Sequence, residues 1–192
     1  MFAVADLRNI FIIGPAGVGK STCGRMLAEE LGYSFVDLDS AFLKRIGNIA
    51  EYIEKEGYVT YGQLNTDLFF TLIAEQERDT VYAMSAGFLL YQDPNGLSSM
   101  NAEALSTLGV SILLLPSRSL EESVSIVVER VLARRPRLNR EKETRKIIDR
   151  YPKYLLHGDI KIFSAESPSR IAARMQREYL DYTERASEQS AG

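Results

Sequence analysis

The sequence has few of the residues that build disulfides and metal centres, one cysteine and one histidine among 192 residues, and it has no tryptophan. A single cysteine excludes a disulfide within the chain and a cysteine-built metal site. No apolar run approaches the length of about 20 residues that spans a membrane, and residues 1–9 lack the basic and apolar regions of a secretory signal. The net charge of −3 gives no overall basic field that would attract nucleic acid. We therefore expect a cytoplasmic protein that has no membrane or nucleic-acid partner.

The composition is that of an ordinary globular protein, with 45% hydrophobic and 26% charged residues. A chain of this length is long enough to bury a proper core and indicates a single domain over residues 1–192. Within it we expect a small lid at about 134–140 and a flexible tail at about 184–192. Nothing in the sequence calls for a second copy, so a monomer is expected.

The most informative stretch runs from Gly14 to Thr22 and matches the pattern G-x-x-x-x-G-K-[ST]. The apolar run 10–13 before it is typical of a strand buried on both faces. Residues 22–31 after it carry apolar side chains at helical spacing, and Gly32 is a suitable C-cap. Strand, glycine-rich loop and helix are the context that a phosphate-binding loop requires.

The chemistry of this loop follows from its residues. Glycines allow successive backbone N–H groups to point at a phosphate chain, and the helix N-terminus adds positive potential. Lys20 would reach the outer phosphates and the Ser21 hydroxyl would hold Mg²⁺. Guanine is disfavoured because the sequence has no Asn-Lys-x-Asp. We predict that ATP with Mg²⁺ binds to Gly14, Pro15, Ala16, Gly17, Val18, Gly19, Lys20, Ser21 and Thr22.

The rest of the chain alternates between apolar runs and amphipathic segments. We expect strands at 10–13, 33–36, 80–84, 110–115 and 160–163, the last at a sheet edge. We expect helices at 22–31, 40–45 with Ser40 as N-cap, 49–56, 60–77, 101–105, 120–133, 141–156 with a break or kink at Pro152, and 167–182. Residues 91–100 are expected to form a loop with a turn at 93–96. This order predicts an α/β fold, a three-layer P-loop NTPase with a central, mostly parallel five-stranded sheet and a small helical lid.

Two carboxylates follow the second expected strand. Asp37 and Asp39 are two residues apart, so on a strand both would point the same way. Ligands of open parallel sheets bind at the carboxyl ends of the strands. One carboxylate can hold Mg²⁺ through water while the other holds and deprotonates an acceptor hydroxyl. The alternative is a solvated strand end in which Asp39 starts a turn.

Four arginines lie beside a proline between two expected helices, at 134–140. Such a cluster is usually a solvated surface. Here it falls where a mobile lid can bring guanidinium groups onto the transferring phosphate, a role that suits their planar, multidentate geometry. Arg130, about one turn earlier, is expected to face the nucleotide.

The order of these motifs resembles the shikimate kinases, small P-loop kinases of the nucleoside-monophosphate-kinase type. The resemblance covers about residues 9–180 and includes Asp-x-Asp, an Arg-Pro lid and a late Arg-x-Pro-x-Tyr motif. It implies that Asp37 lies on the magnesium side and that Asp39 holds and activates the accepting hydroxyl. It also implies Arg135 as the lid arginine and Arg150 as one of two arginines that clamp a substrate carboxylate.

The sequence departs from that family at two places. The other clamp arginine of the family's Gly-Glu-x-x-Phe-Arg is replaced by Gly62. The family's Gly-Gly-Gly, which lets the backbone approach the substrate, reads Ser85-Ala86-Gly87, so only Gly87 is kept as a substrate-binding glycine. Loss of one partner of a buried charge pair typically costs about 2–5 kcal/mol in binding. The resemblance therefore indicates a small-molecule kinase and leaves its acceptor open: shikimate, a related cyclic or hydroxy acid, or a polyol.

Two alternatives share the same scaffold. A regulatory or degenerate kinase-like protein would keep the phosphate loop and lose shikimate kinase activity. A nucleoside-monophosphate kinase would also fit the loop, although Asp37 and Asp39 suit a hydroxyl acceptor better than a phosphate acceptor.

Overall fold

The computed structural model describes residues 8–91 and 96–190. Its centre is a five-stranded sheet in the order β2-β3-β1-β4-β5, in which every neighbouring pair is parallel. The strands are β1 (Asn9–Ile13), β2 (Ser34–Asp37), β3 (Thr80–Ala83), β4 (Gly109–Leu115) and β5 (Ile160–Phe163). The predicted three-layer P-loop fold is confirmed, with β5 at one edge as expected.

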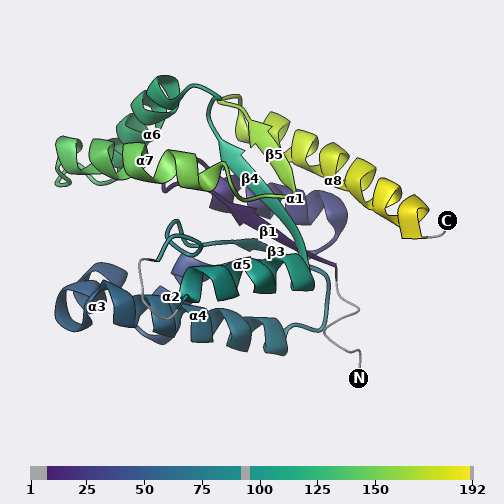
Figure 1. Ribbon diagram of the computed structural model, residues 1–192, viewed down its shortest axis with the longest axis horizontal. Coiled ribbons are helices and arrows are strands. Elements are labelled where there is room, and N and C mark those ends of the chain that lie inside the picture. The colour runs from purple at the N-terminus through teal and green to yellow at the C-terminus, as the bar shows by residue number, and fades with distance from the viewer. Residues whose placement is uncertain (1–7, 92–95, 191–192) are drawn as a thin grey trace.

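Helices cover both faces of the sheet (Figure 1). In chain order they are α1 (Lys20–Leu31), α2 (Leu38–Arg45), α3 (Ile49–Glu56), α4 (Tyr58–Glu75), α5 (Leu97–Leu108), α6 (Leu120–Arg134), α7 (Arg140–Tyr154) and α8 (Pro168–Ser190). Helices α2 to α5 lie on one side, and α1 with α8 lies on the other. The hairpin of α6 and α7 extends beyond the carboxyl ends of β4 and β1.

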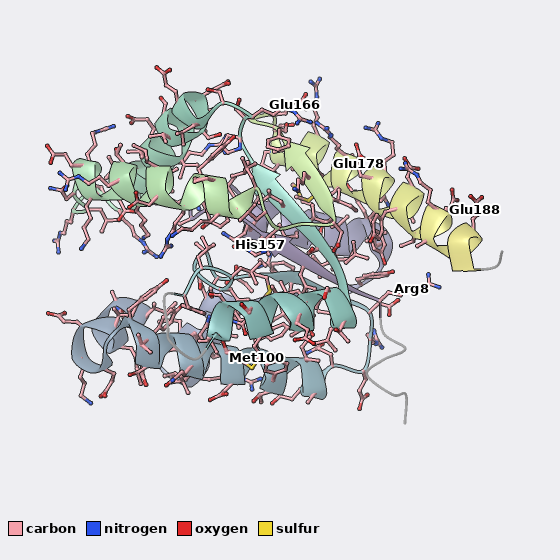
Figure 2. The ribbon with its side chains drawn as sticks, in the orientation of Figure 1. Arg8, Met100, His157, Glu166, Glu178 and Glu188 are labelled. Carbon is pink, nitrogen blue, oxygen red and sulfur yellow. The ribbon has the colours of Figure 1, made fainter. Side chains whose placement is uncertain are left out.

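The central strand β1 is buried along its whole length, as its apolar run predicts. Alternate side chains enter two separate cores, because successive residues of a strand face opposite sides. Phe11 packs in the core under α4 and α5, and Ile12 packs in the core under α1 and α8. Side chains fill both layers, and Glu178 and Glu188 lie on the outer side of α8 (Figure 2).

Three expected element boundaries are wrong. Helix α5 begins at Leu97, so the segment expected to be a loop up to residue 100 is already helical; the turn expected at 93–96 lies largely outside the described residues. Helix α8 continues to Ser190, well past Tyr182 and through most of the expected tail. Helix α7 passes through Pro152 without a break. That proline stands in the last turn, and the helix ends two residues later at Tyr154.

The start of α2 also differs from the prediction. Asp37, and not Ser40, is the N-cap, and its carboxylate accepts from the Ser40 backbone N–H at 2.8 Å. Both residue types cap helices well. The earlier one caps here because the chain turns from extended to helical directly after β2, which places Asp39 in the first turn of α2.

Candidate active site

The phosphate-binding loop joins β1 to α1 at the carboxyl edge of the sheet. At two positions of this loop, neighbouring atoms leave no room for a side chain, so glycine is required. A Cβ at Gly14 would lie 2.3 Å from the Leu114 carbonyl oxygen, and one at Gly17 would lie 2.9 Å from Val131 of α6. Both glycines also adopt positive φ, 140° and 79°, which side chains disfavour. The loop is therefore held against β4 and α6 in a shape that only glycine permits at these positions.

Lys20 is the first residue of α1, and its side chain is folded into the loop. Its Nζ donates to the carbonyl oxygens of Gly14 and Pro15, each at 2.9 Å, and the residue is only 9% exposed. Burial lowers the pKa of Lys20 to about 8, against the opposing effect of Asp39 and Asp37. The lysine and the two carboxylates therefore lie within electrostatic reach of one another, as the sequence predicted.

The two carboxylates come from different elements. Asp37 ends β2, whereas the exposed Asp39 belongs to α2, so the expectation that both project from one strand is wrong. The Ser85 hydroxyl, just past β3, donates to Asp39 Oδ1 at 2.5 Å. Asp37 Oδ1 accepts the hydrogen bond that caps α2, and among the described residues no hydrogen bond to the other carboxylate oxygen is found.

Two arginines of α6, Arg130 and Arg134, act on the loop, and the adjacent Arg135 acts elsewhere. Arg130 Nη1 donates to the Val18 carbonyl at 3.4 Å, which places this guanidinium against the phosphate loop. Arg134 is the lid arginine whose charge contributes to lowering the pKa of Lys20. The charge of Arg135 acts instead on Lys146 of α7, whose pKa is lowered mainly by burial and further by Arg150 and Arg135. The resemblance implies Arg135 as the lid arginine, whereas in this structure the arginine whose charge acts on Lys20 is its neighbour Arg134.

Arg150 lies on α7, and its Nη2 donates to the Tyr58 hydroxyl at 3.0 Å. Two tyrosines hold this end of the helix in place. Tyr151 Oη lies 3.0 and 2.7 Å from the carbonyl oxygens of Ser117 and Arg118, and Tyr154 Oη donates to the Ala86 carbonyl at 2.5 Å. Arg150 is thereby fixed beside the turn that follows β3.

Tyrosines occupy the space beside Gly62, which replaces the clamp arginine, and beside Gly87, the glycine kept from Gly-Gly-Gly. A Cβ at Gly87 would lie 2.3 Å from Tyr58 Oη, and one at Gly62 would lie 3.0 Å from the Tyr91 ring. Asn65 Nδ2 donates to the Tyr91 hydroxyl at 2.9 Å and to the Ser85 hydroxyl at 3.2 Å. Sequence reasoning missed this network, because its members come from α4 and the segment after β3 and carry no motif.

A bound Mg²⁺ would depend on few protein ligands. In the part of the chain that the structure describes, no group of three or more His, Cys, Asp or Glu side chains could hold a metal ion. Mg²⁺ is commonly held by one or two carboxylates together with substrate phosphates and water. The exposed Ser21 at the start of α1 and the available oxygen of Asp37 fit that donor set.

The family model of shikimate kinase matches residues 16–180 of this sequence. The chain belongs to the shikimate kinase family. The shikimate kinase of Actinobacillus pleuropneumoniae is 31% identical over 185 residues, 93% of this chain and 98% of the relative. That of Vibrio campbellii is also 31% identical, over 98% of this chain and 92% of the relative.

Solved structures agree with these sequence relatives. The shikimate kinase from Acinetobacter baumannii in complex with shikimate superposes with a TM-score of 0.74 at 26% identity, covering 93% of this chain and 96% of the other. As a member of the shikimate kinase family the chain is a small-molecule kinase that uses ATP as phosphoryl donor. No helix among the described residues is long and apolar enough to cross a membrane.

Proposed function

We propose that this kinase transfers the γ-phosphoryl group of ATP to a hydroxyl of a small anionic acceptor: shikimate, a related hydroxy acid, or a polyol derivative. The observation that carries the proposal is the meeting of Lys20, Asp37 and Asp39 beside the phosphate loop. A phosphate-binding cation next to a carboxylate that can receive a hydroxyl proton is the arrangement that phosphoryl transfer to an alcohol requires.

The residues divide the work in the following way. Backbone N–H groups of the loop from Gly14 to Thr22 bind the phosphates, and Arg130 supports the loop from outside. Lys20 leaves the carbonyls of Gly14 and Pro15 and pairs with the outer phosphates when ATP binds. A Mg²⁺ ion held between Ser21, Asp37 and the phosphates would neutralise phosphate charge.

Asp39 receives the proton of the accepting hydroxyl as the hydroxyl oxygen bonds to the γ-phosphorus and the bond to ADP breaks. Arg135 of the lid stabilises the charge on the transferring group, which is spread over its outer oxygens. Arg150 binds the anionic group of the acceptor, and the acceptor approaches the backbone at Gly87 when the Tyr58 hydroxyl, which lies there in this structure, moves aside. Catalysis then depends on positioning and charge neutralisation, without a covalent enzyme intermediate.

A turnover assay tests the proposal. ATP hydrolysis and transfer are measured with Mg²⁺, with and without shikimate, beside cyclitols, sugar acids, sugar phosphates and nucleoside monophosphates. We expect a hydroxyl compound to stimulate ATP consumption. Lys20→Ala should abolish the stimulated rate, and Asp39→Asn should lower kcat by about a hundredfold or more while ATP binding is largely retained.

Unaltered turnover in Asp39→Asn would refute the role given to that carboxylate. ATP binding without stimulation by any compound would favour a regulatory or degenerate kinase-like protein, a reading consistent with the tyrosines that fill the space at Gly62 and Gly87. Phosphorylation of a nucleoside monophosphate on its phosphate would place the chain with the nucleoside-monophosphate-type kinases.

A further inference from the structure

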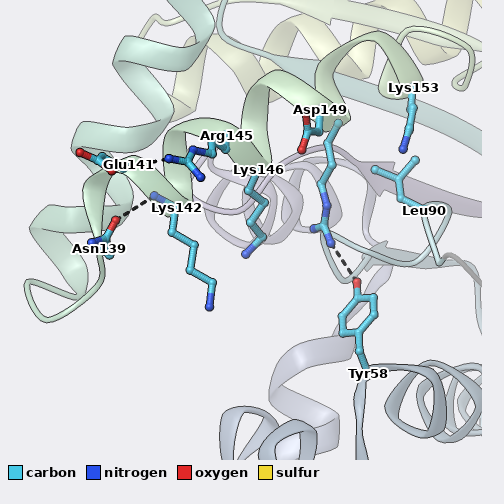
Figure 3. A pocket seen from close by; sticks show the side chains of 10 residues that line it. Tyr58, Leu90, Asn139, Glu141, Lys142, Arg145, Lys146, Asp149 and Lys153 are labelled. Carbon is cyan, nitrogen blue, oxygen red and sulfur yellow. Dashed lines mark hydrogen bonds and ion pairs between the residues drawn. The ribbon is translucent and has the colours of Figure 1, made fainter.

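A cavity of about 550 Å³ lies between α7 and the N-terminal end of α4, next to Arg150. Tyr58 and Leu90 form its apolar wall, and the rest of its lining comes from α7 and the residue before it. Figure 3 shows Lys142, Lys146 and Lys153 extending from α7 toward the side of the cavity on which Tyr58 lies. The cavity thus opens directly onto the arginine that is proposed to bind the acceptor.

The lining is strongly cationic although the whole chain is acidic. Five basic side chains, Lys142, Arg145, Lys146, Arg150 and Lys153, face two carboxylates, Glu141 and Asp149. Glu141 lies 3.7 Å from Arg145. Within the described residues, no carboxylate lies within ion-pair distance of Lys142, Arg150 or Lys153, so positive charge remains in excess.

Lys146 shows that this charge is concentrated. It is half-buried, and burial is the main cause that lowers its pKa; two cations add to this effect, Arg150 one turn along α7 and Arg135 in the segment 134–140. The one carboxylate that opposes them is Glu143, 3.5 Å away. Side chains four residues apart on a helix have Cβ atoms about 6 Å apart, so Lys146 and Arg150 can contact one small anion together.

A single carboxylate does not account for this arrangement. At Gly62, the position expected to supply the other clamp arginine, the Tyr91 ring fills the space, and the cations that line this cavity in the described part of the chain all lie on α7. A dianionic, tetrahedral group can contact more of these cations than a carboxylate can. Phosphate groups are commonly bound by the two parallel N–H donors of an arginine together with several lysine ammonium groups.

We propose that this cavity binds a phosphate group carried by the acceptor itself, so that the acceptor is a small phosphorylated alcohol such as a sugar or polyol phosphate. The inference rests on the proposed function, since it names the class of compound whose hydroxyl receives the phosphoryl group. Lys146 and Arg150 hold the phosphate, Lys142 adds positive potential, and Tyr58 with Leu90 contacts the carbon skeleton.

Turnover with matched compounds tests the substrate class. Pairs that differ only in a phosphate are compared as acceptors: glycerol with glycerol 3-phosphate, glucose with glucose 6-phosphate, and gluconate with 6-phosphogluconate, beside shikimate. We expect a phosphorylated member to exceed its parent compound and shikimate at least tenfold in kcat/KM. Lys146→Gln should raise the KM for that compound about ten- to a hundredfold and change kcat less than threefold, and Lys146→Arg should restore most of the loss.

A binding experiment tests the phosphate site independently of turnover. Inorganic phosphate is titrated into protein saturated with Mg²⁺ and a non-hydrolysable ATP analogue, which occupies the phosphate loop. Phosphate should bind at least tenfold more tightly than acetate, and Lys146→Gln should weaken it about tenfold or more. Arg177→Gln, which removes a unit of charge from the exposed face of α8, is the matched control and should leave phosphate binding unchanged.

The outcomes separate the two proposals. Efficient turnover of shikimate or another unphosphorylated acid, with a KM that Lys146→Gln does not alter, would overturn the phosphate site and leave the kinase function standing. Absence of phosphate binding, or equal binding by Lys146→Gln, would also overturn the site. Phosphate binding that Lys146→Gln abolishes, without turnover of any compound, would support the site and contradict the proposed function.

Discussion

The Ser85 hydroxyl donates a hydrogen bond of 2.5 Å to the Asp39 carboxylate and links the end of β3 to the first turn of α2. Ser85 in turn accepts from Asn65 of α4 at 3.2 Å, so the exposed aspartate is oriented by a buried polar chain. A serine at the position where shikimate kinases have the first glycine of Gly-Gly-Gly therefore supplies an orienting contact that glycine cannot.

This contact predicts a loss of turnover in Ser85→Ala. A hydrogen bond to a charged group contributes about 1.5–3 kcal/mol, and without it the Asp39 side chain samples more rotamers. We expect kcat to fall about tenfold or more with the best acceptor, with ATP affinity unchanged within twofold. Ser85→Thr, which keeps the hydroxyl, is the control. Equal kcat in Ser85→Ala and the unmodified protein would show that the hydrogen bond does not orient the base.

Burial of Lys20 predicts a pH-dependent stability. Its pKa of about 8 lies below the ordinary lysine value of 10.5, so the unfolded chain binds more protons than the folded one between these two pH values. Stability therefore rises with pH across that window, and the burial cost present at pH 7 disappears. Lys20→Met should gain stability relative to the unmodified protein at pH 7, and the difference should shrink by up to about 3 kcal/mol by pH 10.5.

Urea unfolding at pH 7, 9 and 10.5 measures this difference. Lys44→Met, at an exposed position on α2, controls for the effect of removing any lysine charge. A Lys20→Met difference that stays constant with pH would contradict the lowered pKa.

Gly62 and the ring of Tyr91 should be energetically coupled. A Cβ at Gly62 would lie 3.0–3.1 Å from three ring atoms of Tyr91, which is 6% exposed and fixed through its hydroxyl by Asn65. Overpacking costs about 1–3 kcal/mol, and alanine gains up to about 1 kcal/mol over glycine inside a helix. Gly62→Ala should therefore destabilise the protein, whereas in a Tyr91→Ala background it should stabilise it by up to about 1 kcal/mol.

Urea denaturation of the four proteins gives the coupling energy as a double-mutant cycle. Tyr91→Phe keeps the ring and removes the hydroxyl, so Gly62→Ala should remain destabilising in that background. Additive effects of the two substitutions would mean that the Tyr91 ring shifts at no cost in stability, so that it does not exclude a side chain at position 62.

The two adjacent lid arginines provide a matched pair. An arginine placed on the transferring phosphoryl group contributes about 10³–10⁵ to kcat in phosphoryl-transfer enzymes. We expect Arg135→Gln to lower kcat about a thousandfold with ATP affinity largely retained, and Arg134→Gln to lower it less than tenfold. Single-turnover transfer with a saturating acceptor measures both. A larger loss in Arg134→Gln than in Arg135→Gln would show that Arg134, whose charge acts on Lys20 in this structure, is the arginine that stabilises the transferring phosphoryl group.

Much of this architecture can be predicted from local sequence. The loop from Gly14 to Thr22 carries its own strand and helix signals, so the nucleotide site and the parallel fold follow from one stretch and the alternation of elements. The first turn of α2 could not be predicted as well, because Asp37 and Ser40 are equally good caps and only the end of β2 decides between them. The predicted length of helix α5 is too short because Ser98, Ser99 and Asn101 are weak helix formers. The helix is stabilised instead by its contacts with the core, which local sequence does not show.

The acceptor region was the least predictable part. The sequence shows that Gly62 replaces an arginine, but the side chain that fills the space, Tyr91, lies on a segment far along the chain. The same holds for Tyr58 beside Gly87, and for the meeting of Arg135 with Lys146. Such contacts depend on how α4, α6 and α7 pack, and no spacing within a single element encodes them.

Tyr151 and Tyr154 tie the C-terminal end of α7 to the body of the protein, whereas its other end joins the exposed lid. We therefore expect α7, together with α6, to pivot close to Arg150 when the segment 134–140 closes over ATP. Arg140 lies about 16 Å along the axis from Tyr151 at 1.5 Å per residue, so a rotation of about 20° carries the lid end through about 6 Å by the same geometry. Arg150, next to the pivot, moves little, whereas Lys142 and Lys146 lie farther along α7 and move with the lid, so closure over ATP also brings these two lysines onto an acceptor already held at Arg150.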